Sequence, residues 1–496
     1  MTMGSLFLGL VFLCFLFLGD SHPIFFDDEP APICGHDLEK AVREIDLSEG
    51  ASELMNLAQS SVDEYKAPTR VIGSQGHDET LQYITSSLKK LSEYYDFYTQ
   101  KFTAKYSKVF NYDLSINGCP MESASPFKYT PSIEATGKLK LAENEGCEIE
   151  DYPEDLEGYA ALISRGGCSF AQKSKVAKTA GASLAIIYNT EDGPLKGTLH
   201  DPQFETCDLA ASIGISKDDA DKLFSLMESG TPHFEAYIDA CVKEVPTTNI
   251  IAETKAGDHD NVVMLGAHSD SVSAGPGIND NGSGSITLLS LAKYLTKFKI
   301  NNAVRLAWWS AEEEGLLGSN YYTDNLTEEE NKKIRLFLDY DMLASPNYAF
   351  EVYDSDDATN PEGSSKIRDL FTSWYEKNGY SYKLIPFDGR SDYVGFIKNS
   401  IPAGGIATGA ERKKTEEEQE IFGGTAGEPY DSCYHQLCDD LDNLNYEAWV
   451  VNTRLIAYSL GTYADSLDDF PERDITAISS TDSNPTFKYL GDRLLY

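Results

Sequence analysis

The sequence predicts an α/β protein, in which a mixed and largely parallel sheet is flanked by helices and a β-rich module is inserted ahead of most of its strands. Two observations predict this fold. From about residue 247 onward, short apolar runs alternate with segments of helical periodicity, which is the pattern of a parallel sheet covered by helices on both faces. Between about residues 120 and 245, short β-type runs are separated by Gly, Pro and Cys, which indicates a separate module.

The individual elements follow from hydrophobic periodicity. In the amino-terminal part we expect helices at residues 38–45, 53–65 and 79–91, followed by one strand at residues 94–110. In the inserted module, the clearest strands are residues 158–164 and 183–188. Beyond it we expect strands at 261–267, 303–309, 334–342, 382–387 and 401–408, and helices at 285–298, 364–377 and 446–467.

Length and charge restrict the classes of function. The 496 residues suffice for two or three domains. The chain carries 41 Lys+Arg against 80 Asp+Glu, so its net charge is 41 − 80 = −39, which disfavours nucleic acid and anionic membrane surfaces as partners. We expect a signal peptide (1–21), an amino-terminal segment or propeptide (22–60), a first part of the main domain (61–119), the insert (120–245), the remainder of the main domain (246–470) and a tail (471–496).

The apolar run from Leu6 to Gly19 is shorter than the roughly 20 residues that span a bilayer. We interpret it as a signal peptide cleaved after Ser21, and no apolar tail follows Pro471, so we expect export without a membrane anchor. Cleavage removes Cys14 and leaves 9 − 1 = 8 cysteines, an even number that allows complete pairing in an oxidising compartment. Cys433 and Cys438 are near enough in sequence to close one short loop.

Two N-glycosylation sequons occur, at Asn281 and at Asn325. Asn281 lies in a Gly-rich loop that must be tightly packed, so we expect it to remain unmodified. Asn325 lies in a polar stretch after a predicted helix, and we expect it to be the glycosylated site.

Polar side chains that could bind a metal follow several predicted strands. His268 ends one strand, Glu312 and Glu313 follow the next, and Asp341 follows a third. Since ligand sites in such sheets lie beyond the carboxyl ends of the strands, these side chains are expected to meet. Two further candidates lie in loops, namely Asp280 in a Gly-rich loop and His435 between Cys433 and Cys438.

Two imidazoles with several carboxylates form a donor set that suits Zn²⁺ and, less well, Mn²⁺ or Co²⁺. Three carboxylates, from Asp280, Glu313 and Asp341, bring −3 against the +4 of two divalent ions, and one hydroxide would balance the remainder. This arithmetic favours a two-metal hydrolytic centre. Each residue alone also has an ordinary reading: a strand-end His is often only a satisfied polar residue, and Glu312 to Glu314 would usually begin a solvated helix. The Gly-rich loop lacks the Gly-Lys-Ser/Thr ending of a nucleotide-binding loop.

Five sequence strings together are similar to a known family. GAHSDSV, GPGINDNGSGS, AEEEGLLGS, DGRSDY and FGGTAGEPYDSCYH resemble, in order and context, the M28 family of zinc aminopeptidases, most closely its secreted fungal and vacuolar members. The segment RGGCSF at residues 165–170, with the residues that follow it, is similar to the protease-associated domain that such enzymes carry as an insert.

The resemblance implies a role for each candidate. His268 and Asp341 would bind one Zn²⁺, Glu313 and His435 the other, and Asp280 would bridge both. Glu312 would be the general base, Asp270 would orient His268, and Tyr434 would stabilise the tetrahedral oxyanion. Arg390 would lie near the amine end of the substrate.

The expected activity is therefore that of an exported metallo-aminopeptidase with two Zn²⁺ per chain, acting as a monomer on peptides that have a free N-terminus. Three alternatives stay open: a carboxypeptidase or a glutaminyl cyclase on the same scaffold, and a non-catalytic receptor, which the complete set of candidate ligands disfavours. We expect secretion to the cell exterior, with a vacuolar destination as the alternative.

Overall fold

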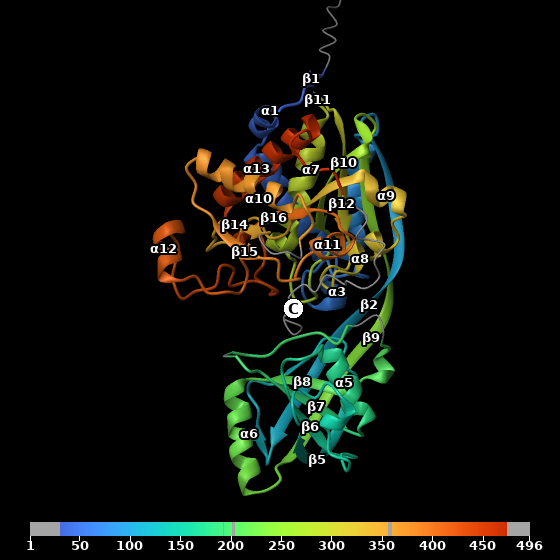
Figure 1. Ribbon diagram of the computed structural model, residues 1–496, viewed down its shortest axis with the longest axis vertical. Coiled ribbons are helices and arrows are strands. Elements are labelled where there is room, and N and C mark those ends of the chain that lie inside the picture. The colour runs from blue at the N-terminus through green and yellow to red at the C-terminus, as the bar shows by residue number, and fades with distance from the viewer. Residues whose placement is uncertain (1–29, 192, 201–203, 356–359, 474–496) are drawn as a thin grey trace, which may run out of the picture.

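A long two-stranded ribbon joins two domains in the computed structural model, which describes residues 30–191, 193–200, 204–355 and 360–473 (Figure 1). The expected signal peptide (1–21) and nearly all of the expected tail (471–496) lie outside the described residues. Among the described residues, no helix combines the length and apolar character needed to cross a membrane.

The larger domain contains a mixed sheet with strand order β15-β14-β16-β13-β10-β12-β9. Its strands are β9 (His233–Thr254), β10 (Asp258–His268), β12 (Asn302–Trp309), β13 (Ile334–Tyr340), β14 (Glu351–Asp354), β15 (Lys383–Pro386) and β16 (Ala403–Ala407). The central strands β12, β10, β13 and β16 run parallel to their neighbours in this series, whereas β9 pairs antiparallel with β12 and β14 pairs antiparallel with β16. The prediction of a largely parallel, mixed sheet is confirmed.

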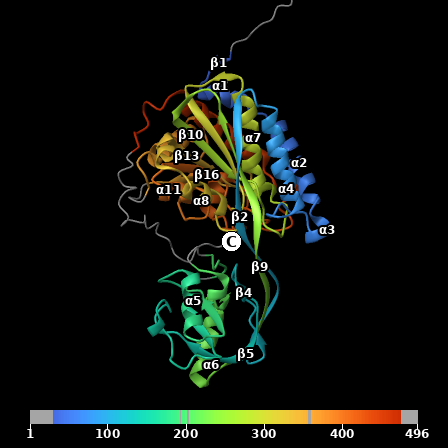
Figure 2. The same cartoon turned by 90° about the vertical axis from the view of Figure 1, so that its right-hand side faces the viewer.

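Helices cover both faces of this sheet (Figure 2), and alternate residues of each strand face opposite layers. In β10, Val263 and Leu265 belong to the same core as helices α2, α7, α10 and α13, whereas Met264 belongs to the core formed with α8 and α11. All three are completely buried, and each such side chain contributes roughly 1.5–3 kcal/mol by burial. The helices are α2 (Glu44–Gln59), α4 (Gln75–Lys89), α7 (Gly284–Leu295), α8 (Leu317–Asp324), α9 (Glu328–Lys333), α10 (Ser364–Lys377), α11 (Tyr393–Lys398), α12 (Glu416–Phe422) and α13 (Tyr446–Asp465).

The amino-terminal segment belongs to the peptidase core. Strand β1 (Ala31–Pro32) pairs with β11 (Phe298–Lys299), and the short helices α1 (Gly35–Lys40) and α3 (Val62–Tyr65) flank α2. The expected helix at 38–45 is wrong, because the chain is extended at Arg43 and a new helix begins at Glu44. The physical reason is that Ile45 is 53% exposed, so the apolar repeat continues from Leu47 instead.

The smaller domain is the insert predicted from short β-type runs separated by Gly, Pro and Cys. Its strands are β3 (Cys119–Pro120), β4 (Ser125–Pro126), β5 (Ile133–Leu141), β6 (Ala160–Ser164), β7 (Leu184–Tyr188) and β8 (Ala211–Ile215), and its helices are α5 (Phe170–Thr179) and α6 (Lys217–Ser229). Strands β5 to β8 run parallel to one another, with apolar cores on the two sides of this small sheet. The insert therefore has its own hydrophobic interior, separate from that of the larger domain.

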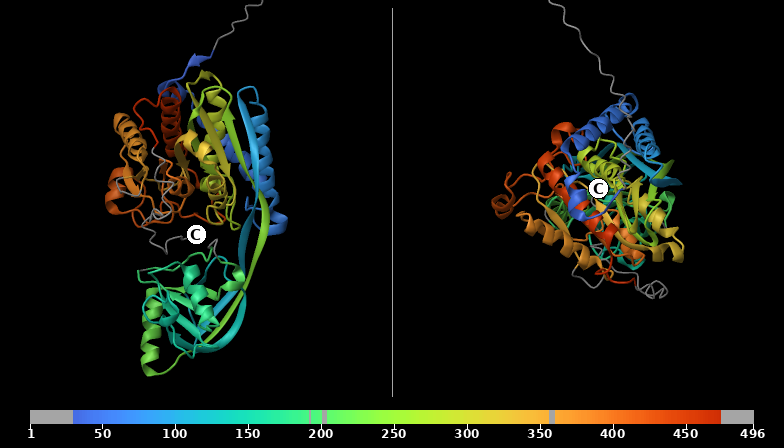
Figure 3. Two further views of the ribbon diagram at one scale, coloured as in Figure 1. Left: turned by 45° about the vertical axis from the view of Figure 1, so that its right-hand side comes forward. Right: turned by 90° about the horizontal axis from the view of Figure 1, so that it is seen from above.

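Strands β2 (Tyr95–Ile116) and β9 form the ribbon and pass through both domains. They pair antiparallel from Tyr95 opposite Thr254 to Ile116 opposite Phe234, with one irregularity between Val109 and Asn111. The ribbon runs along one side of the molecule and holds the insert beyond the edge of the peptidase domain where α3 and α8 lie (Figures 1 and 3).

Two disulfides occur in the described residues, Cys147–Cys168 in the insert and Cys433–Cys438 in the peptidase domain. The complete pairing that an even number of cysteines allows does not occur in the described residues, where Cys34, Cys119, Cys207 and Cys241 are free thiols. The ribbon explains why one pair cannot form. Cys241 lies opposite Lys108 and Cys119 opposite Ile116, so roughly 25 Å of strand separates them, far more than a disulfide spans.

Asp46 joins the start of α2 to α7. Its carboxylate accepts hydrogen bonds from Arg43 at 2.6 and 2.7 Å, from Lys293 at 3.1 Å and from the hydroxyl of Tyr294. Burial opposes ionisation, but the hydrogen bonds from Arg43, Tyr294 and Lys293 outweigh it and lower the pKa of Asp46 from 3.8 to about 2.

We expect Asp46→Asn to lower the free energy of unfolding at pH 7 by about 1 kcal/mol, because solvent screening reduces the larger value that the pKa shift alone implies. The contribution of an Asp with a lowered pKa is complete above the unfolded value and is lost as the pH falls through the folded value. The difference between the variant and the wild type should therefore be roughly halved by pH 3. Denaturant unfolding between pH 7 and pH 3 measures it, and a constant difference would contradict the assigned cause.

Candidate metal centre

The carboxyl ends of three parallel strands place the candidate ligands at one edge of the sheet. In the register of β10 with its neighbours, His268 lies opposite Trp309 of β12 and Gly266 opposite Asp339 of β13. Glu312 and Glu313 leave the end of β12, and Asp341 leaves the end of β13. This edge of the peptidase domain faces the insert (Figure 1).

The candidate ligands form two groups, and within each group the donor atoms lie within 4.8 Å of one another. In the first, Nε2 of His268 is 3.7 Å from Oε2 of Glu312 and 3.4 Å from Oδ1 of Asp341. In the second, Nε2 of His435 is 3.0 Å from Oε2 of Glu313. Glu312 lies close enough to the first group to be either a ligand or a base beside it.

Asp280 lies between the two groups. Its Oδ1 is 3.2 Å from Nε2 of His268, and its Oδ2 is 3.2 Å from Nε2 of His435. The two oxygens of one carboxylate therefore face different imidazoles, which is the arrangement that a bridging ligand requires.

The buried donor atoms fit a bound cation. Within the described chain, Nε2 of His268, Oε1 of Glu313 and Oδ1 of Asp341 are buried and make no hydrogen bond. A buried polar atom without a partner costs about 1–3 kcal/mol, so three at one place indicate a partner of another kind. Imidazole and carboxylate donors together match the coordination preference of Zn²⁺.

The electrostatics of the site favour the same conclusion. Burial, followed by the charges of Asp341 and Asp392, raises the pKa of Glu312 well above its usual range, although His268 opposes the shift. Burial lowers the pKa of His435, but Glu313 and Asp280 outweigh it and raise the value to about 9. The protein thus concentrates negative charge that its own imidazoles do not balance, and a divalent cation would neutralise it.

Asp270 contacts both His268 and the Glu312–Glu313 segment. Its two carboxylate oxygens accept hydrogen bonds from the backbone N–H groups of Glu312 at 3.3 Å and Glu313 at 3.4 Å. Its Oδ1 is 3.7 Å from Nδ1 of His268, and its carbonyl oxygen is 3.3 Å from the same nitrogen. Asp270 can therefore orient His268 and the Glu312–Glu313 backbone together.

Asp439 plays a comparable part for Asp280 and was missed by the sequence reasoning. Its carboxylate accepts hydrogen bonds from the backbone N–H groups of Asn279 at 2.9 Å and Asp280 at 3.0 Å, and from the side-chain amide of Asn443 at 3.1 Å. The available signal was an acidic residue directly after Cys438, at the end of the loop that carries His435.

Asp392 was also not assigned a role, although it lies within the quoted string DGRSDY. Both of its carboxylate oxygens are buried, and burial with the neighbouring charge of Asp339 raises its pKa well above the usual range. The adjacent Ser391 donates a hydrogen bond to Oδ2 of Asp341 at 3.1 Å. This loop therefore supports the Asp341 side of the site.

Tyr434 and Arg390 lie on the His435 side. The ring of Tyr434 stacks on the His435 imidazole with centroids 3.8 Å apart. Arg390 donates to Glu411 at 2.9 and 3.1 Å and to the Tyr434 hydroxyl oxygen at 3.2 Å. Because the phenol oxygen accepts this bond, its own proton can be donated elsewhere.

The backbone takes an unusual conformation at three positions in the site. Ala311, Met342 and His435 all have left-handed φ angles, of 62°, 56° and 58°. Such conformations are unfavourable by about 1–2 kcal/mol for residues with a side chain and persist where the surrounding structure determines them. Two of them, Ala311 and Met342, lie just beyond the ends of β12 and β13, where the chain leaves the sheet.

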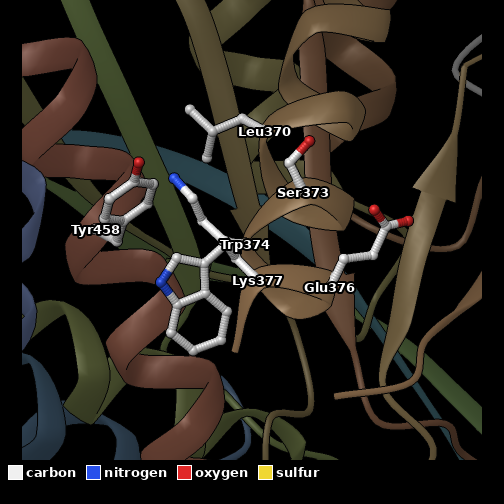
Figure 4. A pocket seen from close by; sticks show the side chains of 6 residues that line it. All are labelled: Leu370, Ser373, Trp374, Glu376, Lys377 and Tyr458. Carbon is white, nitrogen blue, oxygen red and sulfur yellow. The ribbon is translucent and has the colours of Figure 1, made fainter. Parts of the chain in front are cut away.

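A pocket of about 470 Å³ lies away from this site, between α10 and α13 (Figure 4). It is lined by Leu370, Ser373, Trp374, Glu376, Lys377 and Tyr458. No imidazole and a single carboxylate line it, so it does not offer the donor set found at the sheet edge.

Comparison with known proteins agrees with this geometry. Residues 249–460 match peptidase family M28, and residues 135–223 match the PA domain. Aminopeptidase Y of Saccharomyces cerevisiae is 45% identical over 474 residues, covering 92% of this chain and 86% of that protein. The probable leucine aminopeptidase 2 of Aspergillus fumigatus is 45% identical over 437 residues, covering 87% of this chain and 86% of that protein.

Solved structures extend the likeness to the fold. The aminopeptidase from Aneurinibacillus sp. strain AM-1 has a TM-score of 0.71 with 26% identity, covering 89% of this chain and 98% of that one. A zinc aminopeptidase from Bacillus subtilis has a TM-score of 0.58 with 22% identity, covering 89% and 98%. With nearly the whole chain matched at such identity to its relatives, the protein belongs to peptidase family M28 and carries a PA domain as an insert.

Proposed function

We propose that the protein is an exported zinc aminopeptidase that removes residues one at a time from the free N-terminus of peptides. The observation that carries the proposal is the bridging position of Asp280, with one oxygen toward each imidazole. The names of the relatives support the reaction, since they are aminopeptidases. The donor set supports two Zn²⁺ per chain, with Mn²⁺ or Co²⁺ as substitutes.

The five proposed ligands divide between the two ions. His268 and Asp341 would hold one ion, Glu313 and His435 the other, and Asp280 both. Zn²⁺ bound there supplies a Lewis acid for the scissile carbonyl and lowers the pKa of water that it binds.

Glu312 is proposed as the general base. It takes a proton from the attacking water and delivers it to the leaving amine. Its neighbour Glu313 points toward His435, while Glu312 points toward His268, so the two adjacent side chains can perform different tasks. The Tyr434 hydroxyl, whose oxygen accepts from Arg390, would donate its proton to the developing oxyanion.

The excess of carboxylates gives a reason for exopeptidase selectivity. A free α-ammonium group is attracted to a buried cluster of negative charge, whereas an internal peptide bond brings no such charge. The substrate would therefore be positioned by its amine end, and cleavage would release its first residue.

We also propose how the chain is processed. Cleavage after Ser21 would leave a mature chain that keeps residues 30–60, because Leu38, Leu47 and Leu54 lie in the peptidase core. We keep 119, 245 and 470 as proposed domain boundaries, and we propose a destination outside the cell or in a vacuole. We propose that the protein acts as a monomer.

Glu312→Gln should reduce the turnover of leucine p-nitroanilide about 10²–10⁴-fold, because the substitution removes the proton acceptor. Metal content should stay at the wild-type value. The control is Glu417→Gln, at an exposed position of α12, which should leave turnover unchanged. Undiminished turnover of Glu312→Gln with metal bound would exclude the base role.

Metal analysis of purified protein should give two zinc ions per chain, since both donor groups are complete. Removal by a chelator should abolish activity, and Zn²⁺ or Co²⁺ should restore it. Asp280→Asn should reduce the affinity for both ions, because each imidazole faces one of its oxygens. A single ion per chain would favour the glutaminyl cyclase alternative, and unchanged activity after complete metal removal would exclude metal catalysis.

Intact mass of material exported by a glycosylating host should show a chain that begins at His22 and carries one N-glycan. Asn325 is exposed at the end of α8, whereas Asn281 is buried and donates to the carbonyl oxygen of Tyr340 at 2.9 Å. Asn325→Gln alone should remove the glycan, with Asn281 left unchanged. A glycan that persists in Asn325→Gln would contradict this assignment.

A further inference from the structure

The insert touches the segment that carries Glu312 and Glu313. Lys128 and Tyr129 lie just after β4, in the insert. The ammonium group of Lys128 donates a hydrogen bond to the backbone carbonyl oxygen of Glu313. The hydroxyl of Tyr129 lies 2.8 Å from the carbonyl oxygen of Glu314. These contacts join residues that are 185 positions apart in the chain.

Tyr129 belongs to a buried network rather than to a chance surface contact. Its side chain is 2% exposed, and its hydroxyl is also 3.2 Å from the carboxylate of Glu314 and 2.8 Å from the carbonyl oxygen of Lys105. Its backbone N–H donates to the hydroxyl of Ser107 at 2.7 Å, and the N–H of Ser107 lies 3.4 Å from the same Glu314 carboxylate. The insert, the ribbon and the acidic segment therefore share one set of hydrogen bonds.

The backbone of Tyr129 has a left-handed φ of 66°. For a bulky aromatic residue this conformation is rare and persists where surrounding contacts hold it. The loop after β4 is held further by the pairing of Lys128 with Gly197 and Leu199, through backbone hydrogen bonds of 2.9 Å each. The contact is thus presented by a defined loop.

The acidic segment needs support from more than one side. Residues 311–316 begin and end in left-handed conformations, at Ala311 and Leu316, so the turn does not continue a strand or a helix. On one side, Asp270 of the peptidase domain accepts its N–H groups. On the other side, its carbonyl groups are met by Lys128 and Tyr129 of the insert.

We propose that the insert completes the active site, with Lys128 and Tyr129 as positioning residues that hold the 311–316 turn. This inference rests on the proposed aminopeptidase function for its kinetic consequences. Residues that hold a metal ligand in place affect both metal affinity and turnover. The position of the insert on its ribbon would then control the geometry of Glu312 and Glu313, beyond any effect on access to the site.

The test compares Lys128→Met and Tyr129→Phe with two matched controls inside the insert. Tyr152→Phe removes a buried hydroxyl that donates to the carbonyl oxygen of Gly146 at 2.8 Å, and Lys140→Met removes an ammonium group paired with Asp155. Neither control residue touches the turn. Thermal unfolding of these four variants, and of the variant that combines Lys128→Met with Tyr129→Phe, checks that the insert remains folded.

For Lys128→Met combined with Tyr129→Phe, we expect about a ten-fold loss of zinc affinity, measured by competition with a fluorescent chelator. On leucine p-nitroanilide, kcat should fall by a similar factor while KM changes less than about two-fold, because the turn acts on the reacting groups. Both control variants should match the wild type in zinc affinity and in kcat.

Two outcomes would overturn the inference. Zinc affinity and kcat equal to those of the controls would show that the turn holds its shape without the insert. An unchanged kcat on leucine p-nitroanilide, with an altered KM for long peptides alone, would make the insert an access barrier instead. If the wild type binds zinc but releases no N-terminal residue, the proposed function fails, and the affinity comparison still decides the role of Lys128 and Tyr129.

Discussion

Asp280 faces His268 with one carboxylate oxygen and His435 with the other, both at 3.2 Å, and much of the peptidase domain serves to keep it there. A carboxylate between two imidazoles is stable in a buried place only when positive charge balances it. The surrounding residues add further negative charge, from Glu313 and Asp341 among others. The donor atoms of the site therefore suit bound cations, and the fold has to hold several repelling carboxylates within a few ångströms of one another.

Backbone contacts help the fold to meet this constraint. Parallel pairing brings the ends of β10, β12 and β13 to one edge. His268, Glu313 and Asp341 lie at or just after these strand ends and therefore come together there. Asp270 and Asp439 then bind backbone N–H groups next to the candidate ligands. A backbone N–H can bind such a carboxylate without adding a charge that competes with the metal.

The parts of this arrangement that depend on local pattern could be predicted from the sequence. Alternating burial of Val263, Met264 and Leu265 follows from an apolar run between helices, and α10 has the bounds that its periodicity predicts. The position of His268 and Asp341 at strand ends follows from the same pattern. Long-range support could not be predicted, because the contacts of Asp439 with Asn279 and of Lys128 with Glu313 join residues more than a hundred positions apart. For the same reason the sequence allowed Cys119 to pair with Cys241, which their separation along the ribbon prevents.

The ribbon gives this long-range support a physical consequence. Strands β2 and β9 are continuous through both domains, so the insert cannot rotate freely, as a domain on a flexible linker would. Bending of a two-stranded ribbon would instead carry Lys128 and Tyr129 toward or away from the 311–316 turn as one body. Ser107 lies on that ribbon and contacts both Tyr129 and Glu314, so the element that holds the insert also contacts the turn. The turn begins and ends in left-handed conformations at Ala311 and Leu316, which persist only where surrounding contacts hold them, so it would respond to such displacements. The geometry of Glu312, the proposed general base, would thus depend on a domain that contributes none of the proposed metal ligands.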